Sequence, residues 1–172
     1  MSDGVQVPSA PPPGMQLPRA LALIAEHEQN GRLDEAEALL ARVRDVAPDH
    51  PHAAHLAGIV AWRRGRIEDA RALMERSIAL APETALYPRN ICEVYRALGR
   101  YDEALTAGKR AVALAPDDPH ALLNLGIIHY DRMEIADTLA CTEHALRVAP
   151  DLPCAHFERA ESLLLSGRFE AG

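Results

Sequence analysis

Apolar and polar residues alternate along most of the chain with a helical period. Between positions 102 and 115, apolar or small residues recur at intervals of three and four: Ala104, Leu105, Gly108, Ala111, Val112 and Ala115. Charged residues such as Asp102 and Lys109 fall on the opposite side. This spacing predicts an amphipathic helix with one buried face. The composition agrees, because the apolar residues are mostly Ala and Leu and only 4% of the chain is aromatic, which favours helices over β-sheets.

A helix-ending pair, Ala followed by Pro, returns at a constant interval. Its prolines are 34 residues apart along the chain: Pro48, Pro82, Pro116 and Pro150. The residue before a proline avoids the helical conformation, so each pair should end a helix. Aligned on these prolines, the chain divides into four complete blocks and a partial fifth: 17–50, 51–84, 85–118, 119–152 and 153–172.

Each block also carries a turn signal near its middle. The five versions are GRLDEA (31–36), GRIEDA (65–70), GRYDEA (99–104), MEIADT (133–138) and GRFEAG (167–172). A glycine can adopt the left-handed conformation that ends a helix, and acidic residues favour the start of the next one. Every block therefore predicts helix, turn and helix. In the fourth block Met133 and Thr138 replace Gly and Ala, so looser packing is expected over 133–145.

A helix–turn–helix period of 34 residues resembles the tetratricopeptide repeat (TPR) family. The fourth block carries the following residues at positions of the family pattern: Leu122, Leu125, Gly126, Ala145 and Pro150. The resemblance implies an all-α fold over 17–172, a right-handed α-solenoid of stacked antiparallel helix pairs. Residues 1–16 are rich in Pro, Gly and Ser, carry little apolar surface and are expected to form a disordered tail.

Charge, hydropathy and cysteine content narrow the classes of function. The net charge of −7 argues against nucleic acid as a partner. No apolar run reaches the roughly 20 residues that a membrane helix needs, so membrane insertion is not expected. The N-terminus has no secretory-signal pattern. The three cysteines, Cys92, Cys141 and Cys154, lack CxxC spacing, which suggests reduced thiols and a cytoplasmic protein.

The sequence contains no catalytic signature that would predict an enzyme. It has no G-x-S-x-G elbow, no Gly-rich phosphate loop and no HExxH motif. His52 and His55 are three residues apart, and His120 repeats the position of His52 two blocks later. No carboxylate or thiol joins them locally, so polar surface residues are favoured over a metal site. We expect no catalysis, metal or cofactor within these residues.

The resemblance also implies which residues face a concave groove. In TPR proteins the groove is lined by the first helix of each pair. Carried over to this sequence, the main groove positions are His52, His55, Ile59, Trp62, Arg63, Arg89, Asn90, Glu93, Arg96, His120, Leu123, Asn124, Ile127, Tyr130 and Asp131. The partial fifth block adds Phe157, Glu158 and Glu161. Aromatic, branched apolar and hydrogen-bonding side chains together are typical of a peptide-binding surface.

Two features of this groove suggest how a ligand would lie. Asn90 and Asn124 share one repeat position, where each amide could bind a peptide backbone or simply be a common residue of the family. Arg63, Arg89 and Arg96 suggest that an acidic part of a ligand lies near them. A clamp for a C-terminal carboxylate is not expected, because only Asn90 matches the residues that such TPR modules use.

The predicted function is a protein-interaction scaffold that binds a peptide or protein segment in the groove. The alternative is the N-terminal, substrate-recruiting or oligomerising region of a larger enzyme, since the ending SGRFEAG resembles bacterial TPR regions that continue into a glycosyltransferase domain. Three consecutive leucines, Leu163, Leu164 and Leu165, leave an uncapped side on the last repeat. A terminal capping helix over 153–166 is the alternative, but we expect instead that the chain is a fragment of a longer protein or that copies associate into a homo-oligomer through this side.

Overall fold

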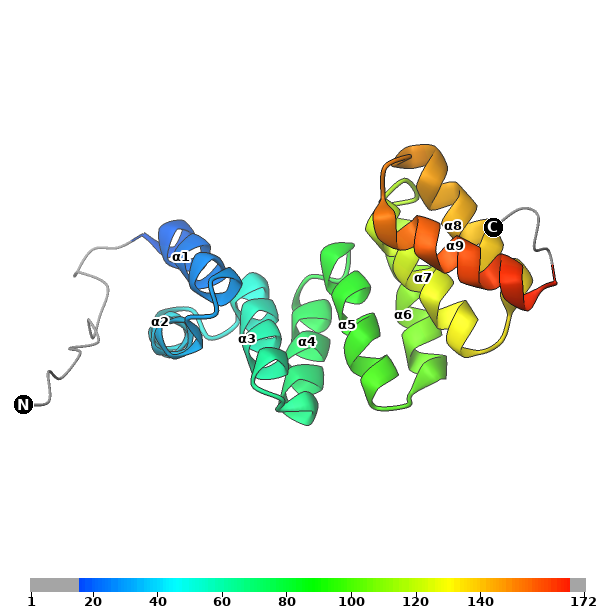
Figure 1. The fold of residues 1–172 in the computed structure, drawn as a ribbon. Helices are drawn as coiled ribbons and strands as arrows, with labels where there is room; N and C mark the ends of the chain where they lie inside the picture. Colours follow the sequence, from blue (N-terminus) through cyan, green and yellow to red (C-terminus); the bar gives the residue numbers. More distant parts are fainter. Residues whose placement is uncertain (1–15, 168–172) are drawn as a thin grey trace, which may run out of the picture. The chain divides into compact units, whose positions relative to one another are not determined.

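A computed structural model describes residues 16–167. Within this range the chain forms nine α-helices and no strand, which confirms the all-α prediction (Figure 1). The helices are α1 (Leu17–Gln29), α2 (Leu33–Val46), α3 (Pro51–Arg63), α4 (Ile67–Leu80), α5 (Leu86–Ala97), α6 (Tyr101–Leu114), α7 (Pro119–Asp131), α8 (Ile135–Val148) and α9 (Pro153–Leu165). No helix in the described range combines the length and apolar character that crossing a bilayer requires.

The predicted helix ends follow from the local sequence. Gly31, Gly65 and Gly99 end the first helix of their repeats in the left-handed conformation, with φ of 72°, 74° and 69°. The helix that follows each glycine carries two acidic residues in its first turn, where they favour the positive end of the helix dipole. Each Ala-Pro corner lies just after the second helix. Within each unit, successive helices therefore reverse direction, and the two helices of a repeat pack as an antiparallel pair (Figure 1).

The chain divides into two compact units, and the first ends at Pro82. Its described part contains α1 to α4, whose apolar faces form one core: Ala20, Leu21, Ile24, Ala36, Leu39, Leu40, Val43, Ala53, Leu56 and Val60. Gly58 allows α3 to approach α4 closely, because a Cβ atom there would lie 2.6 Å from Cγ of Met74. The small residue at this position is thus required by packing rather than by backbone conformation.

The second unit begins at Glu83 and contains α5 to α9. Ile91 and Ile128 are completely buried in it. Its first helices contact one another in order, α5 against α7 and α7 against α9. The outward side chains of α5, α7 and α9 therefore share one surface, which we call the first-helix surface of the second unit.

The fourth repeat departs from the others in sequence but keeps a complete helix pair. Met133 occupies the left-handed position that glycine fills elsewhere, with φ of 60°. Thr138 and Thr142 are completely buried on α8. Their hydroxyl groups donate to the backbone carbonyls of Glu134 and Thr138, at 3.2 and 2.9 Å, so no hydroxyl is left unsatisfied. At these two threonines the structure therefore gives no sign of the looser packing expected from the sequence.

Candidate functional site

The residues predicted to line a groove lie on the first helices α3, α5 and α7, but their exposure differs. Four are exposed: Arg63, Glu93, His120 and Asp131. Nine are half-buried: His52, Ile59, Trp62, Arg89, Asn90, Arg96, Asn124, Ile127 and Tyr130. His55 and Leu123 are buried, with 1% and 6% of their surface exposed. The prediction that His55 and Leu123 lie on the groove surface is therefore wrong, because both side chains pack inside the repeats.

In the first unit, α1 and α3 carry an ion pair and a pair of stacked histidines. Arg63 on α3 donates through Nε to the buried Glu28 on α1, at 2.7 Å. His52 stacks on His55 with ring centroids 6.2 Å apart. Burial, and then the neighbouring His50, lower the pKa of His52, so its ring is neutral at pH 7.

In the second unit, polar side chains of the first-helix surface connect successive repeats. Arg89 on α5 donates to Asp118 at the start of α7, with Nη1 and Oδ2 2.9 Å apart. Asn124 on α7 donates through Nδ2 to the backbone carbonyl of Arg89 at 3.1 Å. Asn90 accepts from Nε of Arg89 at 3.1 Å. The two asparagines thus already hold partners within the chain, and Asn124 fastens one repeat to the next.

Asp118 also caps helix α7. Its Oδ1 accepts from the backbone amides of His120 and Ala121, at 2.9 and 3.3 Å. Burial opposes ionisation of this carboxyl, but the bonds from Arg89 and the two amides outweigh burial, and the pKa of Asp118 lies below its usual range. The Arg89–Asp118 pair is therefore charged on both sides at neutral pH.

The third arginine of the predicted groove is paired as well. Nε of Arg96 on α5 donates to Oδ2 of Asp131 on α7, at 2.5 Å. Arg63, Arg89 and Arg96 each have a carboxylate partner on the next or preceding first helix. Each guanidinium thus already has a carboxylate partner inside the chain, which weakens the physical support for an acidic part of a ligand near them, and that expectation stays a prediction.

Beside the Arg96–Asp131 pair lies an excess of negative charge that sequence reasoning did not single out. Glu158 on α9 is 92% buried, since 8% of its surface is exposed. Its Oε1 atom is buried and has no hydrogen-bond partner among the described residues. Burial, then Glu161 and then Asp131 raise the pKa of Glu158, while Arg96 opposes them. We call Asp131, Glu158 and Glu161 the acidic cluster.

Tyr130 on α7 lies within the influence of the same carboxylates. Burial, followed by the charges of Glu161, Glu158 and Asp131, raises the pKa of its phenol. The tyrosine is therefore neutral at physiological pH and contributes an aromatic ring beside the acidic cluster. The repeat position of Glu158 could have drawn attention to it, since Asn90 and Asn124 occupy the same position in the two preceding repeats.

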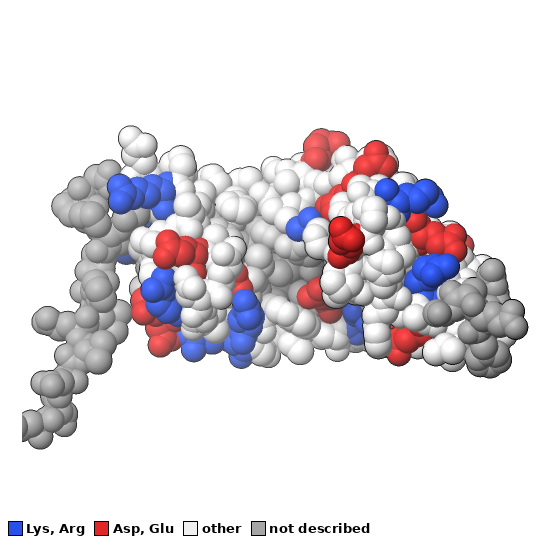
Figure 2. Space-filling view, turned by 45° about the horizontal axis from the view of Figure 1, so that its top comes forward, with Lys and Arg blue, Asp and Glu red and all other residues white. Residues whose placement is uncertain are grey.

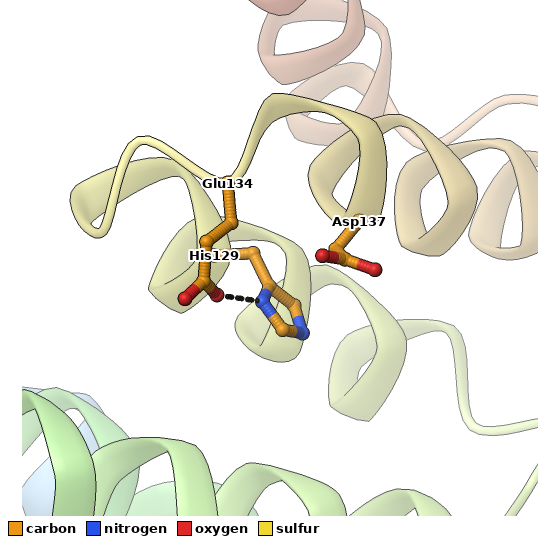
Figure 3. Close-up of side chains that lie close together, drawn as sticks. All are labelled: His129, Glu134 and Asp137. Atoms are coloured by element: carbon orange, nitrogen blue, oxygen red, sulfur yellow. Dashed lines mark hydrogen bonds and ion pairs between the residues drawn. The ribbon is translucent and has the colours of Figure 1, made fainter.

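A second group of ionisable side chains lies at the turn between α7 and α8. His129, Glu134 and Asp137 place one potential metal-ligand atom each within 4.8 Å of the others (Figure 3). Nδ1 of His129 lies 2.6 Å from Oε2 of Glu134, and Oε1 of the same carboxylate accepts from Arg132 at 2.9 Å. These bonds use both oxygens of Glu134, and the guanidinium disfavours a further cation there. The group is explained as a brace for the turn at Met133.

The first unit contains a cavity away from the predicted groove residues. It has a volume of about 560 Å³ and lies between α2, α3 and α4. Alanines of α3 form its floor, including Ala54, Ala57 and Ala61, while Arg44 and Arg76 stand among its lining residues. Small residues leave this space open because their side chains cannot fill the gap between successive second helices. The run of alanines in α3 was the sequence signal for it.

Charges on the molecular surface are mixed in sign. Figure 2 shows Lys and Arg interspersed with Asp and Glu on the visible face of each unit, with no broad basic area.

Two of the cysteines have raised pKa values, which is the opposite of what a reactive thiol shows. Burial, and then Glu93, raise the pKa of Cys92 to about 12, and burial raises the pKa of Cys141 to about 11.

The chain has detectable relatives at the level of the repeat. The sequence profile described as Tetratricopeptide repeat matches residues 21–85, and the profile described as TPR repeat matches residues 93–131. Comparison with curated proteins gave no match. The ending that suggested a bacterial glycosyltransferase includes residues 168–172, which lie outside the described range, as do residues 1–15 of the tail predicted over 1–16. Both interpretations stay predictions.

Solved structures with the same fold include several TPR proteins. A structure of PilF from Pseudomonas aeruginosa is 20% identical, with a TM-score of 0.82, covering 87% of this chain and 68% of PilF. A MamA structure is 16% identical, with a TM-score of 0.76, covering 91% and 88%. The APC/C hetero-tetramer Cut9–Hcn1 is 19% identical, with a TM-score of 0.77, covering 84% and 29%. At such identities these similarities establish the fold alone.

Helix geometry, sequence profiles and solved structures all point to one family. The helix pairs recur with the 34-residue interval of the prolines, glycines end the first helices in the left-handed conformation, and small residues such as Gly58 and Gly126 allow the paired helices to approach. Two repeat profiles match residues 21–85 and 93–131, and proteins built from the same repeat share the fold. The chain belongs to the tetratricopeptide repeat family.

Proposed function

We propose that this chain is a protein-interaction scaffold that binds a polypeptide segment on the outward side chains of its first helices. Membership of the TPR family supports an interaction role in general. The proposal adds the surface that carries the binding, namely α3 in the first unit and α5, α7 and α9 in the second. Neither unit needs a cofactor for such a role.

The observation that carries the proposal is a repeated apolar pair on these helices. Ile59 and Trp62 on α3 recur as Ile127 and Tyr130 on α7, at the same two repeat positions. All four side chains are half-buried, so each keeps part of its apolar surface in contact with water. Partly buried aromatic side chains are typical of the residues that dominate binding energy in protein interfaces.

Between these apolar pairs the same positions carry charge. The third repeat has Glu93 and Arg96 there, and the fifth has Glu161 followed by the exposed Leu164. Within the second unit, an extended ligand crossing α5, α7 and α9 would therefore meet a charged pair, an apolar pair and a mixed pair in turn. This alternation favours a partner that is itself an extended segment with mixed side chains over a uniformly apolar helix.

The proposal is tested by selecting ligands from a phage library of random dodecapeptides, with the chain of residues 1–172 as bait. We expect families of related peptides, whose synthetic versions bind in solution. Substituting Trp62→Ala or Tyr130→Ala should weaken at least one such family by about tenfold or more.

A matched control is Val46→Ala, because Val46 is an exposed apolar residue that ends a second helix. This variant should bind as the unaltered chain does. Recovery of no peptide family, or equal losses for Val46→Ala and for both aromatic variants, would contradict the proposal.

A further inference from the structure

We propose that the acidic cluster of the second unit, together with Tyr130, receives a basic side chain of the bound polypeptide, a lysine or an arginine. This inference rests on the proposed function and specifies the chemistry of the partner. It reverses the expectation from the sequence, in which an acidic part of the ligand would meet arginines of the groove.

Glu158 occupies a repeat position that holds asparagine in the two preceding repeats. In the fourth repeat this position is Asn124, whose amide donates to the carbonyl of Arg89 on the preceding first helix. A carboxylate has no N–H group, so Glu158 cannot make the equivalent bond across to α7. The fifth repeat has thus exchanged a residue that fastens neighbouring repeats for one that only accepts hydrogen bonds.

Glu158 lacks the hydrogen-bond donor that a buried carboxylate needs. Its Oε1 atom is inaccessible to water and has no donor among the described residues. Leaving such an acceptor unsatisfied costs free energy, and a charged one costs more. A positive charge that a ligand brings next to the small part of Glu158 that stays exposed would offset the charge of the carboxylate.

Negative charge exceeds positive charge around Glu158. Three carboxylates act here, those of Asp131, Glu158 and Glu161, and Arg96 is the cation that influences Glu158. Arg96 is already bonded to Asp131 at 2.5 Å. The cluster therefore has two more negative charges than its paired arginine can balance, which favours a cation from outside.

The surroundings favour an organic cation over a bare metal ion. Mg²⁺ and Ca²⁺ prefer six or more oxygen ligands, whereas the carboxylates of the cluster act on the phenol of Tyr130, and Ile127 on the same helix is half-buried. A lysine or arginine can lay its aliphatic stem along these apolar groups while its charged end reaches the carboxylates. An ammonium or guanidinium group near the face of Tyr130 would gain a further cation–π attraction.

The test uses the dodecapeptides selected on the unaltered chain, and measures binding of synthetic peptides by calorimetry. We expect one family in which Lys or Arg is enriched at a fixed position, with affinity falling as salt rises. Replacing that basic residue with norleucine should weaken binding by about tenfold. The Glu158→Gln variant should lose a similar factor for the basic peptide and none for its norleucine version.

Asp151→Asn is the matched control, since it removes one negative charge from an exposed residue in the α8–α9 loop. It should leave the preference for the basic peptide unchanged. If peptides bind without an enriched basic residue, or if Glu158→Gln keeps the full preference, the inference is overturned while the proposed function stands. If no peptide is selected, the proposed function fails, and this inference fails with it.

Discussion

At the scale of single residues, the behaviour of a side chain here depends on its partner more than on its type. Arg89 and Arg96 looked like free cations in the sequence, yet each is bonded to a carboxylate of the next first helix. Glu158 looked like an ordinary groove residue, yet it is a buried acceptor without a donor. The side chain that is left unsatisfied is therefore the one most able to respond to a ligand.

Glu158 should make folding stability depend on pH in a direction opposite to that of a salt-bridged carboxylate. Its pKa in the folded chain lies above the 4.5 of an ordinary glutamate. The folded state thus holds the proton more strongly than the unfolded state, and stability falls as pH rises through the interval between 4.5 and the raised value. Above that interval the full cost of the buried charge is present.

Glu158→Gln should therefore raise the free energy of unfolding at pH 7, by about 1–2 kcal/mol. The advantage should shrink on acidification and disappear below pH 4.5, where the wild-type carboxyl is protonated in both states. Urea unfolding followed by circular dichroism between pH 4 and 8 measures it, with Asp151→Asn as control. A gain that is constant with pH, or a loss at pH 7, would show that Glu158 is not an unpaired buried charge.

At the scale of the helix pair, the repeats tolerate a departure where the rest of the repeat compensates. Met133 takes a backbone conformation that normally belongs to glycine, with φ of 60°. The adjoining residue Glu134 binds both His129 and Arg132, and these contacts hold the turn in place. At the other described turns of this kind a glycine stands in place of Met133, and no glutamate–histidine contact like that of Glu134 with His129 supports the turn.

Replacing Met133 with Gly should stabilise the chain by about 0.5–1 kcal/mol, because the left-handed conformation costs a side-chain-bearing residue more than it costs glycine. Little contact is lost, since Met133 is largely exposed. Met133→Ala keeps the unfavourable conformation and should change stability little. Chemical denaturation of the two variants decides, and an equal effect of both substitutions would mean that the backbone conformation is not the cause.

Some features of the helix pairs could be predicted from the sequence, and others could not. Helix limits were predictable, because they depend on local signals such as Gly65 and the Ala-Pro corner at Pro82. The hydrogen bonds of Thr138 and Thr142 were not predictable. Both hydroxyl groups bond to backbone carbonyls within their own segment, and the expected pattern of small residues does not reveal this.

At the scale of the whole molecule, the family could be predicted from the 34-residue interval, whereas the binding surface could be predicted only in outline. The register placed all fifteen main groove residues on first helices, but it could not show that His55 and Leu123 turn inward. Ion pairs between repeats depend on side-chain conformations that spacing does not determine. The cavity between α2, α3 and α4 also depends on how far helices separate, which alanine content only suggests.

The central claim is that a polypeptide binds to the first helices. Hydrogen exchange of the chain, alone and saturated with the tightest selected dodecapeptide, tests it most directly. The account predicts slower exchange in α3, or in α7 together with at least one of α5 and α9, with α2 and α4 unchanged. Slower exchange confined to α2 and α4, the helices around the cavity of the first unit, would contradict it.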